Sequence, residues 1–126
     1  MTKIAISSPA LAPPVGPFSQ AIRADGFLYL SGQVGQDAAT GKLVEGGVAA
    51  QTERVLRNLQ AVLEAAGKGF DDVVRAGVFL TNMGDFAAMN QIYARHFSQP
   101  YPARTTIAVV ALPLGAAVEI DLVVRA

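Results

Sequence analysis

Residues 48–66 place apolar side chains at alternating steps of four and three, which is the repeat of one face of an α-helix. The stripe consists of Val48, Thr52, Val55, Leu59, Val62 and Ala66. Arg54 and Arg57 fall off the stripe and are predicted to face water, and Gly67 suits the C-cap position. A helix of this kind has one long apolar face to bury, so other elements must cover it.

Strand patterns surround this helix. Asp25-Gly26 suits a tight primed turn, which predicts a hairpin over residues 20–34. Near the C-terminus, apolar residues point one way while Glu119 and Asp121 point the other, as in a half-buried strand. The predicted strands are residues 4–6, the two arms of the hairpin, 72–80, 104–110 and 117–124.

A second helix is expected after Asp85, which can serve as its N-cap. Its apolar face would consist of Phe86, Met89, Tyr93 and Phe97. The proline-rich residues 9–17 predict an irregular loop. The order of two or three strands, helix, strand, helix and two strands predicts an α+β sandwich. In it, two helices pack on one face of a mixed sheet, in one domain spanning residues 1–126.

Composition bears on partners. Hydrophobic residues make up 52% of the chain and charged residues 16%, an apolar surplus that favours a homo-oligomer. The ten basic and ten acidic residues cancel, and no basic patch stands out, so nucleic acid is not expected as a partner. No apolar run is long enough to span a membrane, and no secretory signal is visible. The cytoplasm is the default location.

Several classes of catalytic site lack the residues they need. The chain has no cysteine, and His96 is its only histidine, so a catalytic triad has little to draw on. No carboxylates cluster with His96 as metal ligands would, and it is interpreted as a partly exposed helix residue. Gly46-Gly47 lacks the pattern of a phosphate-binding loop. We therefore expect neither a metal nor a cofactor.

Two charged residues near the C-terminus remain. Arg104 opens a predicted strand that is otherwise apolar, where it is either a surface salt-bridge partner or a fork for a planar anion. Glu119 lies in another apolar strand, where the alternative to a functional carboxylate is a solvated sheet face. Asp121 shares that face as a helper or a surface charge. Residue type alone leaves these readings open.

Several separate motifs resemble one family. Residues 102–106 (PARTT), then Leu112-Pro113, then residues 118–120 (VEI) closely resemble the C-terminal signature of the RidA/YjgF family. Residues 16–21 (GPFSQA) are similar to its Gly-Pro-Tyr-Ser-Gln segment. Residues 31–33 (SGQ), 64–67 (EAAG) and spaced positions within 85–97 match in the same order. The resemblance covers nearly the whole chain.

This resemblance implies a chorismate-mutase-like fold, three chains packed as a homotrimer, and active sites in the clefts between subunits. It implies a metal-free deaminase that hydrolyses 2-iminobutanoate, 2-iminopropanoate and the related enamine 2-aminoacrylate to 2-keto acids and ammonia. Arg104 would bind the substrate carboxylate, and Glu119 would orient and activate water. The other positions implied to line the site are Phe18, Ser31, Gly32, Asn90, Thr105 and Thr106.

Strand geometry bears on how such a site is built. If the last two strands form a simple hairpin, Arg104 pairs near Val123 and Glu119 pairs near Ala108. The two functional residues would then lie roughly 13 Å apart along the ladder, at about 3.3 Å per residue. A site that uses both is therefore easier to build from two chains than from one.

Two positions depart from the family pattern. Phe18 stands where the family has tyrosine, so a hydroxyl is missing, and slower or more apolar-selective turnover is expected. Thr106 stands where cysteine is frequent, so thiol-dependent behaviour is not expected. Two alternative functions follow from the residues: a non-catalytic binder of keto or amino acids, which Phe18 favours, and a protein-binding or holdase role, suggested only by the apolar composition, which burial in a trimer explains more simply. Some members of the family are described as ribonucleases or translation inhibitors, and the neutral charge and the lack of a histidine pair argue against that role here.

Overall fold

The structure, a computed structural model, describes residues 2–126. Its strands are β1 (Ile4–Ile6), β2 (Ala21–Ala24), β3 (Phe27–Val34), β4 (Val73–Leu80), β5 (Ala103–Ala108) and β6 (Val118–Arg125). Its helices are α1 (Gly47–Ala65) and α2 (Phe86–Tyr93). Short 3-10 turns follow at η1 (Phe70–Asp72), η2 (Met83–Asp85) and η3 (Pro113–Gly115). No helix of the described part of the chain is long and apolar enough to cross a membrane.

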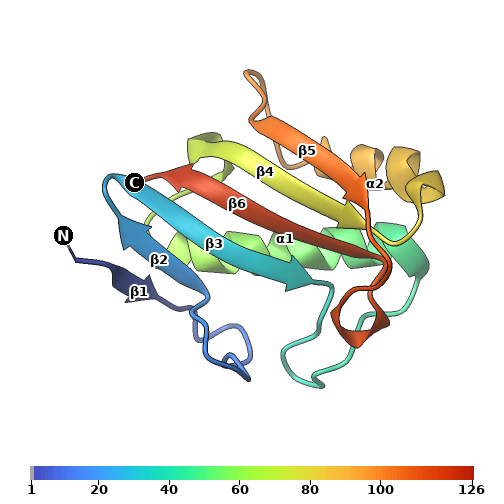
Figure 1. The fold of residues 1–126 in the computed structure, drawn as a ribbon, viewed down its shortest axis with the longest axis horizontal. Helices are drawn as coiled ribbons and strands as arrows, with labels where there is room; N and C mark the ends of the chain where they lie inside the picture. The colour runs from blue at the N-terminus through green and yellow to red at the C-terminus, as the bar shows by residue number, and fades with distance from the viewer. Residues whose placement is uncertain (1) are drawn as a thin grey trace.

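The six strands form one mixed sheet in the order β1-β2-β3-β6-β4-β5. Only β4 and β5 run parallel, and the other neighbours are antiparallel. Both helices cover the same face of the sheet, and the opposite face carries no helix (Figure 1). The predicted α+β fold with two helices on one face of a mixed sheet is therefore confirmed.

Helix α1 confirms the predicted stripe, because Thr52, Val55, Leu59 and Val62 are all buried. Its end is a Schellman motif: the amide of Gly67 donates to Glu64 O at 3.0 Å, and the amide of Lys68 donates to Leu63 O at 2.9 Å. Gly67 has φ +72°, the left-handed conformation that this motif requires.

The β2–β3 turn also follows the prediction. Asp25 and Gly26 both have positive φ, at 51° and 81°, as a primed hairpin turn requires. Within β3, the register with β6 shifts between Leu30 and Gln33. This bulge lies at Ser31 and Gly32, two of the residues proposed from the sequence for the site.

The prediction of a simple hairpin for the last two strands is wrong. β5 pairs with β4 alone, in parallel, because α2 carries the chain from one strand to the other as a helical crossover. β6 then inserts between β3 and β4 and pairs with both. Its alternation explains this central place, since Val118, Ile120, Leu122 and Val124 are all buried beneath the helices.

Helix α2 is shorter than expected and is capped differently. Asp85 sits at its N-cap without a side-chain hydrogen bond, and Asn82 accepts one instead, from the Gly84 amide at 2.8 Å. The helix ends at Tyr93, so His96 and Phe97 follow it rather than lie within it. Phe97 still joins the core, stacked on Tyr93 with 4.3 Å between ring centroids.

Candidate functional site

The sheet places Arg104 and Glu119 on opposite faces. Arg104 aligns with Ala76 of β4, whereas Glu119 aligns with Phe79 of the same strand. Side chains alternate along a strand, and positions three apart therefore point to opposite faces. Ala76 is buried beneath the helices, so Arg104 lies on the helical face and Glu119 on the open one. The backbones of Arg104 and Glu119 are roughly 14 Å apart, because they are separated by three residues along the strand direction and by two inter-strand spacings across β4.

Glu119 lines a cavity of about 320 Å³ together with Phe18 and Gly32. The cavity lies among the proline-rich loop of residues 11–18, the end of β3 and the η3 turn. Phe18 lines this cavity and is 54% exposed. Three residues proposed from the sequence are thus brought together at one place.

The Glu119 carboxylate makes no hydrogen bond or ion pair with any residue between 2 and 126. Burial raises its pKa above the ordinary value of 4.5, and the negative charge of Asp121 raises that pKa further. A carboxylate with a raised pKa is a stronger base, and the missing donors leave its oxygens available to a water molecule. The geometry therefore suits a general base.

A charge substitution tests this electrostatic arrangement. Asp121→Asn removes the nearby negative charge, so the pKa of Glu119 falls and its carboxylate ionises at lower pH. If Glu119 acts as the base, the acid limb of the kcat/KM–pH profile moves to lower pH in this variant. An acid limb that stays in place or moves upward would contradict the assignment.

Gly32 permits the close approach of Glu119 to β3. A Cβ atom built on Gly32 would lie 2.5 Å from Glu119 Oε2, closer than real Cβ contacts allow. If Glu119 is the general base, Gly32→Ala should displace its carboxylate and lower kcat/KM roughly a hundredfold, since small misplacements of a catalytic group are costly. Gly69→Ala is the matched control, because no atom lies within 4 Å of its added Cβ. Equal activity of the two variants would show that the close contact is irrelevant.

Arg104 belongs to a second cavity, of about 330 Å³, which Asn90 also lines. Its guanidinium lies over the ring of Tyr93 at 4.7 Å from the centroid, and 5.7 Å from that of Phe86. It forms no salt bridge with any carboxylate of the described chain. Cation–π contact with two rings orients a guanidinium while its N–H groups remain available to an anion.

Two buried hydroxyl groups accompany Arg104. The hydroxyl of Tyr93 and Oγ1 of Thr106 have no hydrogen-bond partner among residues 2–126. Burial raises the pKa of Tyr93, and the positive charge of Arg104 opposes this rise. The sequence assigned Tyr93 to the apolar face of the helix, because periodicity gives no sign that its ring supports an arginine.

Ser31 and Thr105, also predicted to line the site, make hydrogen bonds within the chain. Ser31 Oγ donates to the Ser19 carbonyl at 2.6 Å, so it fastens the loop to β3. Thr105 lies on the open face, where its Oγ1 accepts from Arg75 Nη2 at 3.0 Å. Thr105 also shares a cavity with Asp121, away from Arg104. Within one chain, the predicted site is therefore divided between the Glu119 cavity, the Arg104 cavity and this third location.

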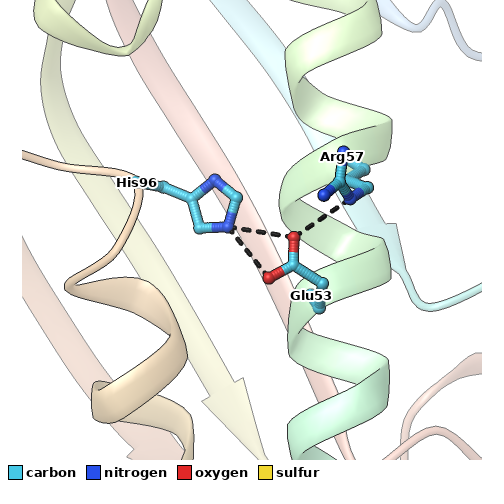
Figure 2. A network of polar contacts seen from close by, with 3 residues as sticks. All are labelled: Glu53, Arg57 and His96. Atoms are coloured by element: carbon cyan, nitrogen blue, oxygen red, sulfur yellow. Dashed lines mark hydrogen bonds and ion pairs between the residues drawn. The ribbon is translucent and has the colours of Figure 1, made fainter.

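His96 is occupied by a structural contact (Figure 2). Its Nε2 lies 3.2 Å and 3.1 Å from the two Glu53 carboxylate oxygens, and Arg57 also contacts Glu53 at 3.1 Å. Its side chain is 15% exposed, so the prediction of a partly exposed residue is confirmed, but His96 lies beyond the end of α2 and the prediction that it belongs to the helix is wrong. In residues 2–126, no three histidine, cysteine, aspartate or glutamate side chains group as metal ligands would.

Comparison with known proteins points to one family. The family model described as endoribonuclease L-PSP matches residues 9–126. The protein DfrA of Myxococcus xanthus is 48% identical over 125 residues, covering 98% of this chain and 95% of that protein. The human 2-iminobutanoate/2-iminopropanoate deaminase is 43% identical over 119 residues, which cover 94% of this chain and 87% of the human protein.

Solved structures agree. The crystal structure of RidA from an Antarctic Psychrobacter species superposes with a TM-score of 0.92 at 41% identity, and the match covers 98% of this chain and 99% of that one. Since the family model spans most of the chain and these relatives match it along nearly their whole length, the protein belongs to the RidA/YjgF family, as its motifs had indicated.

Proposed function

We propose that the protein hydrolyses 2-imino acids to 2-keto acids and ammonia, at sites that combine Arg104 of one subunit with Glu119 of another. The observation that carries this proposal is the separation of these residues on opposite faces of one sheet, each beside its own cavity. Neither has a charged partner within the described chain. The name of the human relative supports the reaction.

The proposed chemistry needs only a fork and a base. Arg104 holds the substrate carboxylate, so that the adjacent C=N carbon faces Glu119. A water oxygen bonds to this carbon while Glu119 accepts a water proton and then passes it to the nitrogen. Glu119 then accepts the hydroxyl proton and passes it to the nitrogen as well, so that the C–N bond breaks, ammonia leaves and the C=O bond forms.

The open face of the sheet supports assembly as a homotrimer. Large apolar side chains are exposed there at Tyr29 and Ile107, and Phe27 extends the patch. Contact between copies of the chain would bury these side chains. It would also bring Glu119, on the open face of one subunit, toward the Arg104 cavity of another subunit. Small imino and keto acids are then the ligands, bound between subunits.

The test is turnover of 2-aminoacrylate released in place by a PLP-dependent dehydratase. The proposal predicts that the protein accelerates pyruvate formation well above the spontaneous rate. Pyruvate formation at the spontaneous rate would favour the second candidate, a non-catalytic binder of keto or amino acids. Phe18 favours that candidate, since it lacks the hydroxyl that the family's tyrosine has.

Substitution of Phe18 by tyrosine should increase the activity. Phe18→Tyr restores a hydroxyl at the edge of the Glu119 cavity, where it can bond the ligand or the water. We expect kcat/KM for 2-aminoacrylate to rise several-fold, since a neutral hydrogen bond contributes about 1 kcal/mol. An unchanged rate would make the departure from the family pattern neutral.

A further inference from the structure

The place of the Glu119 carboxylate depends on the backbone that carries it. No group of residues 2–126 donates a hydrogen bond to this carboxylate, and Val34 and Glu119 form the last pair between β3 and β6. The ends of strands fray unless other contacts hold them. Resting on the proposed function, we propose that Gln51 and Asn58 of α1 are positioning residues. They hold the ends of β3 and β6 so that Glu119 stays where it can activate water.

Gln51 and Asn58 share one side of α1. They are seven residues apart, which is close to two helical turns, so their side chains point in similar directions. Both lie beside the apolar stripe, where Val55 and Leu59 pack in the core. Gln51 is half-buried and Asn58 is 4% exposed. Buried polar groups need hydrogen-bond partners, and both side chains find theirs in the strand ends rather than in the helix.

Gln51 holds the start of β6. Its Oε1 accepts a hydrogen bond from the amide of Ala117, two residues before Glu119, at 2.8 Å. The carbonyl of Ala117 accepts from the Thr81 amide at 3.2 Å, so both backbone polar groups of Ala117 are fixed. The helix also lies directly against the end of β3, since a Cβ atom built on Gly35 would lie 2.9 Å from Gln51 Cα. The strand ends therefore have little room to move against α1.

Asn58 holds the end of β3. Its Nδ2 donates to Val34 O at 3.3 Å and to Gln36 O at 3.1 Å. Val34 is the residue that pairs with Glu119. Since Glu119 also approaches Gly32 more closely than a Cβ would allow, a small movement of either strand displaces the carboxylate. The two amides of α1 therefore act on the same carboxylate through two different strands.

Two substitutions of Gln51 separate its hydrogen bond from the packing of its side chain. Gln51→Met keeps an unbranched side chain of similar length but has no oxygen for the Ala117 amide. Gln51→Glu keeps an oxygen that can accept this bond. The control is Thr52→Val, which removes a hydrogen bond that stays within the helix, from Thr52 Oγ1 to Val48 O at 2.7 Å. The assays measure kcat for 2-aminoacrylate and the Kd for pyruvate, at a temperature where each variant is folded.

We expect Gln51→Met to lower kcat roughly tenfold, because small misplacements of a catalytic group are costly. Its Kd for pyruvate should stay unchanged, since Arg104 belongs to a different cavity. Gln51→Glu should recover most of kcat, and Thr52→Val should lose none. Asn58→Ala should also lower kcat. The double variant of Gln51→Met and Asn58→Ala should lose less than the product of the two single losses, because both substitutions release the same carboxylate.

Titration of Glu119 gives a measurement that does not depend on turnover. Burial raises the pKa of this carboxyl group. A carboxylate that moves toward water in Gln51→Met should therefore titrate with a lower pKa than in the unchanged protein. In Gln51→Glu and Thr52→Val, this pKa should stay raised. NMR follows the carboxyl carbon in protein labelled at glutamate, and its signal is assigned by its absence from Glu119→Gln.

The outcomes separate this inference from the proposed function. If no imine is hydrolysed but the pKa of Glu119 falls in Gln51→Met and not in Gln51→Glu, the reaction fails and the positioning role stands. If imines are hydrolysed and Gln51→Met changes neither kcat nor this pKa, the positioning role fails and the reaction stands. A lower melting temperature with unchanged kcat, or equal losses of kcat in Gln51→Met and Gln51→Glu, would mean that Gln51 only stabilises the fold. Either result would overturn the inference.

Discussion

Arg104→Ala should lose nearly all turnover of 2-imino acids while its oligomer stays intact. The guanidinium is the group proposed to grip the substrate carboxylate, and it has no carboxylate partner of its own among the described residues. Removing one member of a charge-assisted pair costs about 2–5 kcal/mol, so kcat/KM should fall by roughly a thousandfold. Steady-state kinetics on 2-aminoacrylate and light scattering together check this result.

Two further variants show whether activity depends on the paired hydrogen bonds of the Arg104 guanidinium or only on its positive charge. Arg104→Lys keeps the charge but loses the paired hydrogen bonds, so it should recover only a small part of the activity. Arg125→Ala removes another arginine of the same sheet, one that contacts Asp72 at 3.4 Å and is 69% exposed. It should be as active as the unchanged protein. Retained activity in Arg104→Ala would remove this residue from the substrate site.

Glu119→Gln should bind keto acids nearly as well as the unchanged protein but hydrolyse imines far more slowly. The amide keeps the size of the side chain and cannot accept a proton from water. General-base catalysis typically contributes a factor of about 10² to 10⁴, and kcat should fall within this range. Calorimetry with pyruvate measures binding separately. Equal loss of binding and turnover would mean that Glu119 has a structural role.

The same variant should be more stable than the unchanged protein at neutral pH. Because the folded-state pKa of Glu119 is raised, the folded protein favours the protonated form. The resulting stability is present below pH 4.5 and is lost as the pH rises through the folded pKa. Glu119→Gln should therefore raise the melting temperature at pH 7 and change it little at pH 4. A lower melting temperature at pH 7 would contradict the burial argument.

A site shared between two subunits allows two inactive variants to complement each other. Each inactive variant keeps the half of the site that the other lacks. Co-refolded Arg104→Ala and Glu119→Gln subunits should therefore regain part of the lost activity, because some interfaces then contain both intact residues. Activity that stays at the level of the separate variants would indicate that both residues act within one chain.

Local patterns predicted most of the fold. The stripe of α1, its glycine cap and the alternation of β6 each depend on neighbours in sequence, and all three were confirmed. The order of the strands in the sheet could not be predicted from these patterns. An apolar strand that follows β5 in sequence shows the same alternation whether it pairs with β5 or inserts between two other strands. Burial of both edges of β6 between β3 and β4 depends on the whole sheet, which no local repeat encodes.

The candidate site was predicted as a set of residues and not as an arrangement. Motif resemblance supplied Arg104 and Glu119, but the structure alone shows that they occupy opposite faces. The contact of Arg104 with Tyr93 joins a strand to a helix across the fold, and no spacing predicts it. The approach of Glu119 to Gly32 is similar, although a glycine within a strand pattern is a signal of close backbone contact.

A crystal soaked with pyruvate tests the central claim most directly. The pyruvate carboxylate should lie within about 3 Å of the Arg104 guanidinium, with both of its oxygens accepting hydrogen bonds. Its keto carbon should face the Glu119 carboxylate of an adjacent subunit. Pyruvate bound away from Arg104, or held between Arg104 and Glu119 of the same chain, would contradict the account.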